Sequence, residues 1–210
     1  NRTFARALKK LPEMESAKQL RHLISRVYTK NMKILDVGCA AGHYYHSLKK
    51  IDKNINYLGI DSTKQYIKFA KKIFKKNIDT NFYCEDLYKI TKKHFKKFDI
   101  TFCCNVLLHL PTIDLPLKNL LKTTKKYCFI RTLISENTHL SKFLYDDQYK
   151  NNQPVNFVHQ NTYSYNYIKK LLKKLGNYKI EFINDDFKYK NINTEYKKYN
   201  KKQNAVTQVF

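Results

Sequence analysis

The sequence has no apolar run of the roughly 20 residues that a membrane-spanning helix needs, and it has no internal repeat. Its five cysteines lack the paired spacing that zinc sites use. We therefore expect no membrane span, no metal site and no disulfides, and we place the chain in a reduced, cytoplasmic compartment. The sequence begins without Met and shows no signal peptide.

Arginine is also scarce, because only five of the 41 basic residues are Arg and the rest are Lys. The formal net charge is +24. Nucleic-acid surfaces favour Arg, whose planar guanidinium donates two parallel hydrogen bonds. Lys pairs such as Lys71-Lys72 and Lys75-Lys76 are typical of solvated helix faces. We therefore expect no nucleic-acid partner, and we leave open whether the charge attracts an anionic small molecule.

The length of 210 residues predicts one domain with a full hydrophobic core. Hydrophobic residues make up 42% of the chain and aromatic residues 14%, as in folded globular proteins. Nothing in the composition decides the oligomeric state, which the sequence leaves open.

A strand, a glycine turn and a helix follow one another early in the chain. Residues 34–37 are apolar and partly β-branched apart from Asp36, which predicts a buried strand, and residues 43–50 predict an amphipathic helix. Between them stand Gly38 and Gly42, which let the backbone turn sharply and let a ligand lie against it. The pattern predicts a nucleotide-binding α/β unit.

A second predicted strand, residues 57–60, ends in Asp61. A carboxylate at the end of the second strand, about 20 residues past the glycine turn, is placed to accept hydrogen bonds from both hydroxyls of a ribose. Asp61 is therefore our candidate for a ribose ligand.

Four motifs in order make the chain resemble the class I S-adenosylmethionine-dependent methyltransferases, in particular those that act on small molecules. They occur over residues 31–135 with the family's spacing. The motifs are Asp36-Val37-Gly38-Cys39-Ala40-Ala41-Gly42, Gly59-Ile60-Asp61, Cys84-Glu85-Asp86-Leu87, and the run from Phe98 to Pro111. The chain departs from the family pattern at Ala40, which replaces the middle glycine of the first motif.

The resemblance implies that S-adenosylmethionine is the cofactor and S-adenosylhomocysteine the product. It implies a cofactor site of Asp36, Gly38, Ala40, Gly42, Asp61, Ser62, Asp86, Leu87, Asn105 and Val106. Glu85 competes with Asp86 for the contact to the adenine. Relatives that methylate amines of bases or protein glutamine often carry Asn-Pro-Pro-Tyr where this chain has Asn105-Val106-Leu107-Leu108, which argues against that chemistry.

His109 is our candidate for the catalytic base, because an imidazole can remove a proton from a hydroxyl near neutral pH. The alternative is a structural histidine that packs at the helix start before Pro111. By location, the candidates for substrate binding are Arg131, Tyr145, His159 and Tyr163.

Strands and helices are expected to alternate, which predicts an α/β, Rossmann-like fold. We expect a seven-stranded, mostly parallel sheet with helices on both faces and an antiparallel C-terminal hairpin. The strands are predicted near 33–37, 56–60, 80–84, 98–104, 126–132, 178–184 and 204–210. A helix is predicted near 164–175, ended by Gly176.

We interpret the chain as a single methyltransferase domain of four parts. These are an N-terminal helical cap (1–30) interrupted at Pro12, a cofactor-binding core (31–134), a substrate cap (135–164), and a C-terminal helix with the hairpin (165–210). Residues 135–164 fit neither a helical nor a strand period, and long connections in α/β domains often bind ligands.

The expected reaction is O-methylation of a small polar acceptor. Our leading hypothesis is a sugar, a sugar nucleotide or a phosphorylated metabolite of bacterial surface-polysaccharide synthesis, to which the polar and aromatic segment 135–164 is suited. Two alternatives stay open at this point. One is an RNA or tRNA methyltransferase, which the charge of +24 favours, and the other is a non-catalytic subunit that binds S-adenosylmethionine.

Overall fold

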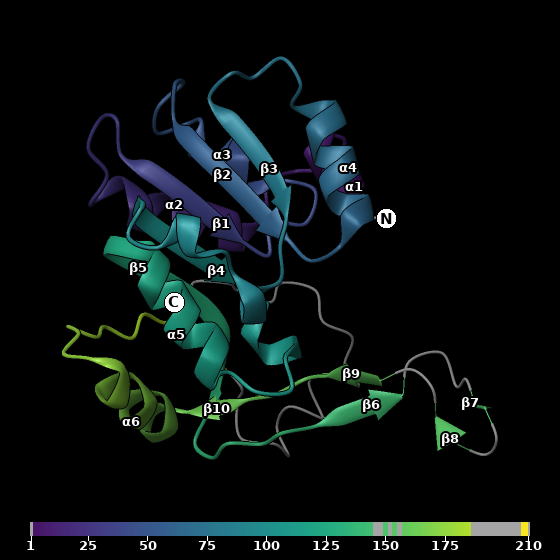
Figure 1. The fold of residues 1–210 in the computed structure, drawn as a ribbon, viewed down its shortest axis with the longest axis vertical. Coiled ribbons are helices and arrows are strands. Elements are labelled where there is room, and N and C mark those ends of the chain that lie inside the picture. Colours follow the sequence, from purple (N-terminus) through teal and green to yellow (C-terminus); the bar gives the residue numbers. More distant parts are fainter. Residues whose placement is uncertain (1, 145–148, 151–152, 155–156, 186–206, 210) are drawn as a thin grey trace. The chain divides into compact units, whose positions relative to one another are not determined.

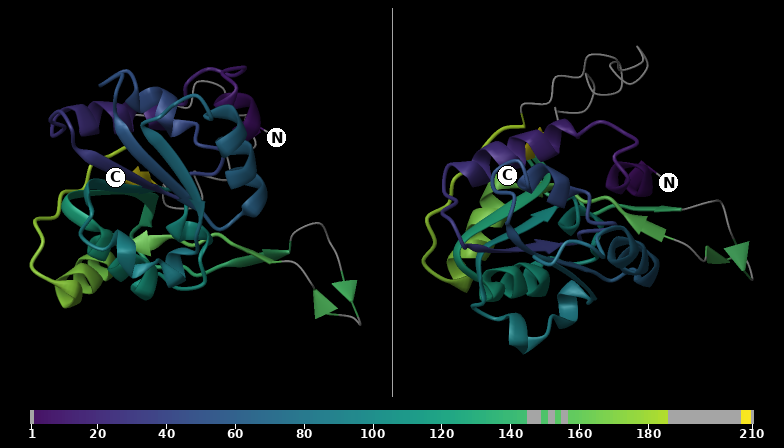
Figure 2. Two further views of the ribbon diagram at one scale, coloured as in Figure 1. Left: turned by 45° about the horizontal axis from the view of Figure 1, so that its top comes forward. Right: turned by 90° about the horizontal axis from the view of Figure 1, so that it is seen from above.

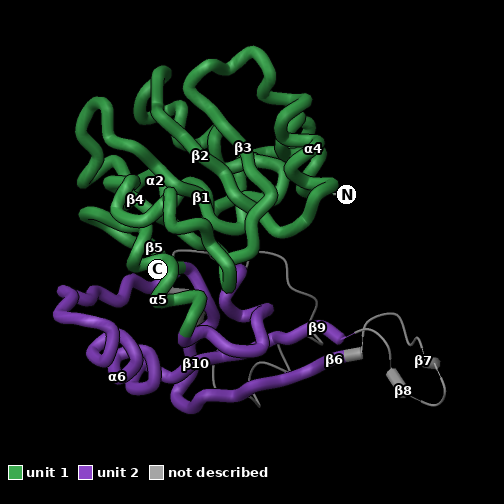
Figure 3. Tube along the Cα trace, in the orientation of Figure 1, with its two compact units in different colours: residues 1–104, 115–130 green, residues 105–114, 131–210 purple. Residues whose placement is uncertain are grey.

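The structure is a computed structural model that describes residues 2–144, 149–150, 153–154, 157–185 and 207–209. The chain divides into two compact units, coloured green and purple in Figure 3. Unit 1 comprises residues 1–104 and 115–130, and unit 2 comprises residues 105–114 and 131–210.

Unit 1 contains a sheet in which β1 pairs in parallel with β2 and β4, and β2 pairs in parallel with β3 (Figure 1). Its strands are β1 (Lys33–Val37), β2 (Asn56–Asp61), β3 (Thr80–Cys84), β4 (Phe98–Cys104) and the first part of β5 (Thr124–Ser135). The register places Val37 beside Ile60 and Asp61 beside Cys84. The carboxyl ends of three strands therefore meet at one edge, where open α/β sheets bind ligands.

Helices cover both faces of this sheet, so its central strands β1 and β4 bury residues on both of their sides. Figure 2 shows α2 (Glu15–Ser25) and α3 (Tyr44–Leu48) on one face and α5 (Asp114–Thr123) on the other. Ile34 and Leu35 are neighbours in β1 and point to opposite faces, yet both are fully buried. A parallel strand buried on both faces reads as a continuous apolar run.

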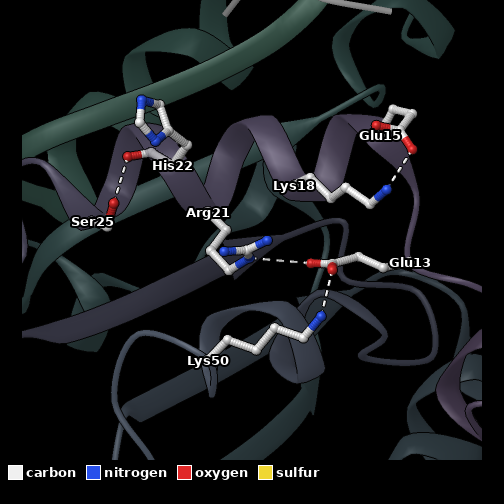
Figure 4. Close-up of polar contacts among 7 residues, drawn as sticks. All are labelled: Glu13, Glu15, Lys18, Arg21, His22, Ser25 and Lys50. Atoms are coloured by element: carbon white, nitrogen blue, oxygen red, sulfur yellow. Dashed lines mark hydrogen bonds and ion pairs between the residues drawn. The ribbon is translucent and has the colours of Figure 1, made fainter.

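The first 30 residues fold as two helices, as the position of Pro12 predicts. Helix α1 (Arg2–Ala7) ends before it and α2 begins after it. The carboxylate of Glu13 accepts hydrogen bonds from Arg21 Nε (3.3 Å) and Lys50 Nζ (2.5 Å), which ties the start of α2 to the residues after α3 (Figure 4). Burial opposes ionisation of Glu13, but the bonds from Lys50 and Ser47 and the charges of Arg21 and Lys50 lower its pKa.

Helix α4 (Lys64–Ile73) follows β2 and buries Ile67 and Ala70. Phe4 of α1 packs its ring against Tyr66 and Phe69, with ring centroids 5.5 and 4.2 Å apart. Two short 3-10 helices, η1 (Leu87–Lys89) and η2 (Lys92–His94), connect β3 to β4.

Unit 2 contains the end of β5 and the elements of residues 105–114 and 136–210 that the structure describes. They are η3 (Leu107–His109), β6 (Lys142–Leu144), β7 (Tyr149–Lys150), β8 (Gln153–Pro154), β9 (Phe157–His159), β10 (Tyr163–Ser164), α6 (Tyr165–Leu175) and β11 (Thr207–Val209). Strand β10 pairs in parallel with β5, and β11 pairs with it in antiparallel fashion. Strands β6 and β9, and likewise β7 and β8, form antiparallel pairs.

The predicted fold class is confirmed: the sheet is mostly parallel, Rossmann-like and covered by helices. Six strands form one row in the order β10, β5, β4, β1, β2, β3, where seven were expected, and β11 pairs with β5 outside this row. The helix predicted near 164–175 is confirmed as α6, which Ser164 caps at its N-terminus and Gly176 ends.

The strand predicted near 178–184 does not form; of its alternating apolar residues, Phe182 packs against α6, whereas Tyr178 and Ile180 are exposed. Phe182 lies against Tyr165 with ring centroids 4.8 Å apart, and the Tyr178 hydroxyl donates to the Leu175 carbonyl. The strand predicted near 204–210 is represented by β11.

Candidate functional site

The turn after β1 is held by the end of β2. The amides of Gly38 and Cys39 both donate to the carbonyl of Ile60, at 2.8 and 3.0 Å. Three residues of the turn have left-handed backbones: Gly38 (φ 78°), Ala40 (φ 46°) and Gly42 (φ 77°). At Ala40 this conformation costs about 1–2 kcal/mol relative to glycine, and such strain is found at functional sites.

Asp61 contacts this turn, and its role as a ribose ligand stays a prediction. Its Oδ2 accepts a hydrogen bond from the Ala40 amide at 2.9 Å, and its Oδ1 accepts one from the Thr63 amide at 2.8 Å. The side chain is half-buried. Each carboxylate oxygen keeps a further lone pair, so the group fits a ligand that carries two neighbouring hydroxyls.

Two glycines near Asp61 are required by close packing: both adjoin the Phe82 ring, and Gly42 also adjoins the Phe74 ring, which a Cβ would approach to 2.9 Å. A Cβ atom at Gly42 would lie 2.7 Å from Phe82 Cε1, and a Cβ at Gly59 would lie 2.8 Å from Phe82 Cδ1 and from Cys39 Sγ. The turn is therefore pressed against β2 and β3 more closely than any larger residue permits.

Asp36 lies in the interior below this turn, and only 1% of its surface is exposed. The hydroxyl of Tyr57 on β2 donates to its Oδ2 at 2.5 Å. Burial raises the pKa of Asp36 to about 8; the Tyr57 bond opposes this shift, and the charge of Asp61 adds to it. Sequence reasoning missed Tyr57, since a strand tyrosine carries no signal of its buried partner. Cofactor contact by Asp36 stays a prediction.

The residues after β3 divide their roles. Glu85 is held inside unit 1: its Oε1 accepts from His94 Nε2 at 3.0 Å and its Oε2 from the Thr91 amide at 3.3 Å. Burial opposes ionisation of Glu85, but the bonds from His94 and Thr91 lower its pKa. Asp86 is exposed and caps η1 through the Tyr88 amide. Of the two acidic candidates, Asp86 is the more accessible.

Ser62 and Leu87 complete the predicted cofactor residues of unit 1. Ser62 is exposed directly after Asp61, and Leu87 is 6% exposed directly after Asp86. Both therefore stand at the carboxyl ends of β2 and β3 that the register brings to one edge.

In unit 2, Arg131 holds Asn105, the first residue after β4. Asn105 has a left-handed backbone (φ 58°), its amide donates to the Arg131 carbonyl at 2.8 Å, and its Oδ1 accepts from Arg131 Nη1 at 2.7 Å. Arg131 is 6% exposed and also pairs with Asp185. A guanidinium only donates, so the Nδ2 group of Asn105 is left for a ligand.

The contacts of Arg131 bear on its predicted role in substrate binding. We expected Arg131 to bind substrate, but its guanidinium is engaged by Asn105 and Asp185, and substrate contact by it stays a prediction. Asp185 was not identified from the sequence, because it lies 54 positions after Arg131 and no motif links the two residues. Val106 follows Asn105 and is half-buried.

His109 is exposed at the end of η3, and its Nδ1 lies 2.9 Å from the carbonyl oxygen of His159. A carbonyl accepts but cannot donate, so Nδ1 carries the proton and Nε2 carries the lone pair of the neutral ring. This geometry suits a base whose reactive nitrogen is Nε2.

The other substrate candidates have different surroundings. Tyr163 is 1% exposed, and its hydroxyl donates to the Leu107 carbonyl at 3.0 Å and lies 3.2 Å from Asn161 Nδ2. The side chain of His159 is half-buried. Tyr145 lies outside the described residues. Substrate binding by these three residues stays a prediction.

Within the described ranges, no three His, Cys, Asp or Glu side chains are grouped to hold a metal ion. The same ranges contain no helix whose length and hydropathy would suit a membrane span. All five cysteines are free thiols.

Residues 28–209 match the protein family described as "Methyltransferase domain". Two curated relatives carry the name "Ubiquinone biosynthesis O-methyltransferase". The protein from Pelagibacter ubique (strain HTCC1062) is 34% identical over 113 residues, which are 50% of this chain and 43% of that protein. The protein from Coxiella burnetii (strain RSA 493 / Nine Mile phase I) is 28% identical over 102 residues, 48% of this chain and 42% of that protein.

The chain thus spans less than half the length of these relatives. Two solved structures share the fold. The N-terminal domain of EvdMO1, crystallised in the presence of SAH and D-fucose, has a TM-score of 0.63 at 11% identity and covers 94% of this chain and 82% of its own. The [4+2]-cyclase SpnF has a TM-score of 0.60 at 15% identity and covers 80% of this chain and 60% of its own.

Proposed function

The chain belongs to the methyltransferase-domain family, and from this premise we propose that it transfers a methyl group from S-adenosylmethionine to a hydroxyl of a small polar molecule. One observation carries the proposal: the Asp61 carboxylate stands 2.9 Å from the amide of left-handed Ala40, at the edge where β1 and β2 end. This unites the first two motifs of a nucleoside-binding edge.

The residues of unit 1 fit the cofactor in their chemistry. Asp61 would accept hydrogen bonds from the two ribose hydroxyls, Asp86 would accept one from the adenine amine, and Leu87 with Ser62 would hold the base. Gly38, Ala40 and Gly42 let the backbone approach the methionine part. When bound, S-adenosylmethionine supplies a methyl group activated on sulfonium, and S-adenosylhomocysteine is the product.

The residues of unit 2 act on the acceptor. His109 Nε2 removes the hydroxyl proton, because the bond from Nδ1 to the His159 carbonyl leaves Nε2 as the basic nitrogen. Asn105 presents its Nδ2 as a donor to an acceptor oxygen, since its Oδ1 is bound to Arg131. The protein's main task is then to align the acceptor and exclude water.

Two acceptor classes are supported. Residues 135–164 are polar and aromatic, which suits a sugar, a sugar nucleotide or a phosphorylated metabolite of surface-polysaccharide synthesis, and the charge of +24 suits an anionic one. The curated relatives are named for O-methylation in ubiquinone biosynthesis, which favours a hydroxylated aromatic ring as the second class. We also propose a cytoplasmic location, because the five cysteines are free thiols and thiols stay reduced in the cytoplasm.

A screen for release of S-adenosylhomocysteine tests the proposal. The full chain is incubated with S-adenosylmethionine and with sugar phosphates, nucleotide sugars or hydroxylated aromatic compounds, and the product is examined by NMR for a new O-methyl group. We expect release that depends on one of these classes and that is lost in Asp61→Ala. Methyl transfer only to RNA would overturn the small-molecule proposal.

The shared fold does not decide activity by itself, since SpnF with the same fold is a cyclase. A subunit that only binds the cofactor would show S-adenosylmethionine binding by calorimetry without methyl transfer to any acceptor. RNA binding is expected to be weak and to vanish at physiological salt, because it would depend on screened phosphate contacts.

A further inference from the structure

The turn that carries His109 is held on four consecutive residues by one later segment of unit 2, residues 159–163. The Tyr163 hydroxyl donates to the Leu107 carbonyl (3.0 Å), and the Asn161 amide donates to the Leu108 carbonyl (2.8 Å). His109 Nδ1 donates to the His159 carbonyl (2.9 Å), and Asn161 Nδ2 donates to the Leu110 carbonyl (2.8 Å).

Asn161 is the centre of this arrangement and is fully buried. Its Nδ2 bonds the Leu110 carbonyl and the Tyr163 hydroxyl, its Oδ1 accepts from the Ser141 amide, and its own amide bonds Leu108. Burying an amide side chain costs free energy unless its groups are hydrogen-bonded. Every polar group of this side chain is satisfied. The side chain holds the turn at Leu110, after His109, and the backbone amide holds it at Leu108, before His109.

The clamp has a chemical consequence for an exposed histidine. Without a partner, the imidazole of His109 would rotate and exchange its proton between Nδ1 and Nε2. The carbonyl of His159 accepts from Nδ1 alone, so it fixes both the ring orientation and the tautomer. Nε2 is then unprotonated and directed away from the clamp.

We propose that residues 159–163 form a positioning clamp for the catalytic base, with Asn161 as its positioning residue and Nε2 of His109 as the nitrogen that takes the acceptor proton. The inference rests on the proposed function, because it assigns the base of that reaction. It adds a requirement: the segment after β9 must be bonded to the turn before His109 is in its reactive form.

NMR of the full chain labelled with ¹⁵N-histidine tests the clamp without any acceptor. The His109 signals are assigned by their loss in His109→Asn. We expect a protonated Nδ1 and an unprotonated Nε2 in the wild type, and a mixture of tautomers in Asn161→Ala. Thr138→Val is the matched control, because it removes bonds to Ser164, the residue directly after the clamp segment, without touching the turn; it should keep the wild-type signals.

Asn161→Ala carries a risk of unfolding unit 2, so circular dichroism is recorded and Tyr163→Phe is the second variant. It keeps the buried ring and removes the hydroxyl, which bonds the Leu107 carbonyl and Asn161 Nδ2, and we expect a smaller shift toward the second tautomer. A wild-type His109 protonated on Nε2, or folded variants that both keep the wild-type tautomer, would overturn the clamp.

Turnover supplies the second readout, with the acceptor found in the screen. Folded Asn161→Ala should lose turnover on the order of 10²-fold, as expected for a misplaced catalytic group, with an unchanged affinity for S-adenosylmethionine. Equal turnover in Asn161→Ala and wild type would contradict the inference. If the wild type shows the expected tautomer but methylates no hydroxyl, the proposed function fails; if an active enzyme shows the other tautomer, the clamp fails.

Discussion

The turns that follow β1 and β4 are held by different means. In the turn after β1, backbone amides of Gly38 and Cys39 bond the end of the adjacent strand, and glycine permits the close packing. In the turn after β4, side chains of Arg131, Asn161 and Tyr163 supply bonds besides those of the Asn105 and Asn161 amides, and these three residues lie 26 to 56 positions from the partners of their side chains. The first turn is therefore sensitive to added bulk, and the second to loss of single polar groups.

The largest effect is expected at His109, in the turn held by side chains. His109→Ala should lower turnover by roughly 10²–10⁴-fold, the usual contribution of a general base. His109→Asn should lose as much turnover while its amide can still donate to the His159 carbonyl, so its melting temperature should stay nearer the wild type. Initial rates of S-adenosylhomocysteine release and thermal unfolding measure both. Wild-type turnover in folded His109→Asn would remove the residue from the reaction.

The next effect is expected at Asp61, in the turn held by the backbone. Asp61→Ala should lower the affinity for S-adenosylmethionine by about 10- to 1000-fold, because each hydrogen bond to a charged group contributes roughly 1.5–3 kcal/mol. Calorimetry of the folded variant measures this. Asp61→Asn is the matched control, since it keeps one acceptor oxygen and should lose less. Unchanged affinity in Asp61→Ala would exclude Asp61 from the site.

Gly42→Ala in the turn after β1 and Gly59→Ala in the adjacent strand β2 separate the effect of packing from that of backbone conformation. Each new Cβ meets the Phe82 ring at less than 3 Å, and overpacking of this kind costs about 1–3 kcal/mol of unfolding free energy. Only Gly42 also has a left-handed backbone (φ 77°). Adding Phe82→Leu should therefore restore stability better in Gly59→Ala than in Gly42→Ala, as urea unfolding would measure. Equal recovery in both would contradict the strain at Gly42.

The turn after β1 could be predicted from the sequence because its causes are local. An apolar β-branched run makes the strand, and Gly38 and Gly42 supply the left-handed backbone that the turn needs. The predicted ranges 33–37, 80–84 and 98–104 coincide with β1, β3 and β4 for the same reason.

The turn after β4 could be predicted only in part. Position in a motif singled out Asn105 and His109, but Asn161 and Asp185 have no neighbouring residues that reveal their partners. Asn is usually exposed, so a fully buried one escapes pattern reasoning. The alternation of apolar and polar residues wrongly predicted a strand near 178–184. An extended segment that packs Phe182 on Tyr165 shows the same alternation without being a strand.

The smallest effect concerns the pH dependence of stability, which we expect from the buried carboxyl group of Asp36 below the turn after β1. Burial raises its pKa from 3.8 to about 8, so the folded chain keeps a proton that the unfolded chain releases. The stability from this proton is present below the unfolded pKa and is lost as the pH rises toward 8. His43, whose pKa burial lowers from 6.5 to about 4, acts in the opposite direction but only below pH 6.5.

The window from pH 6.5 to 8 therefore isolates Asp36 from His43. One proton per molecule changes the unfolding free energy by about 1.4 kcal/mol per pH unit, so the wild type should lose up to about 2 kcal/mol across the window. Asp36→Asn keeps an oxygen that can accept from Tyr57 but does not titrate, and its stability should be flat. Urea unfolding at the two ends measures this slope. An equal slope in both proteins would mean that the titrating group lies elsewhere, and that Asp36 is ionised beneath the turn.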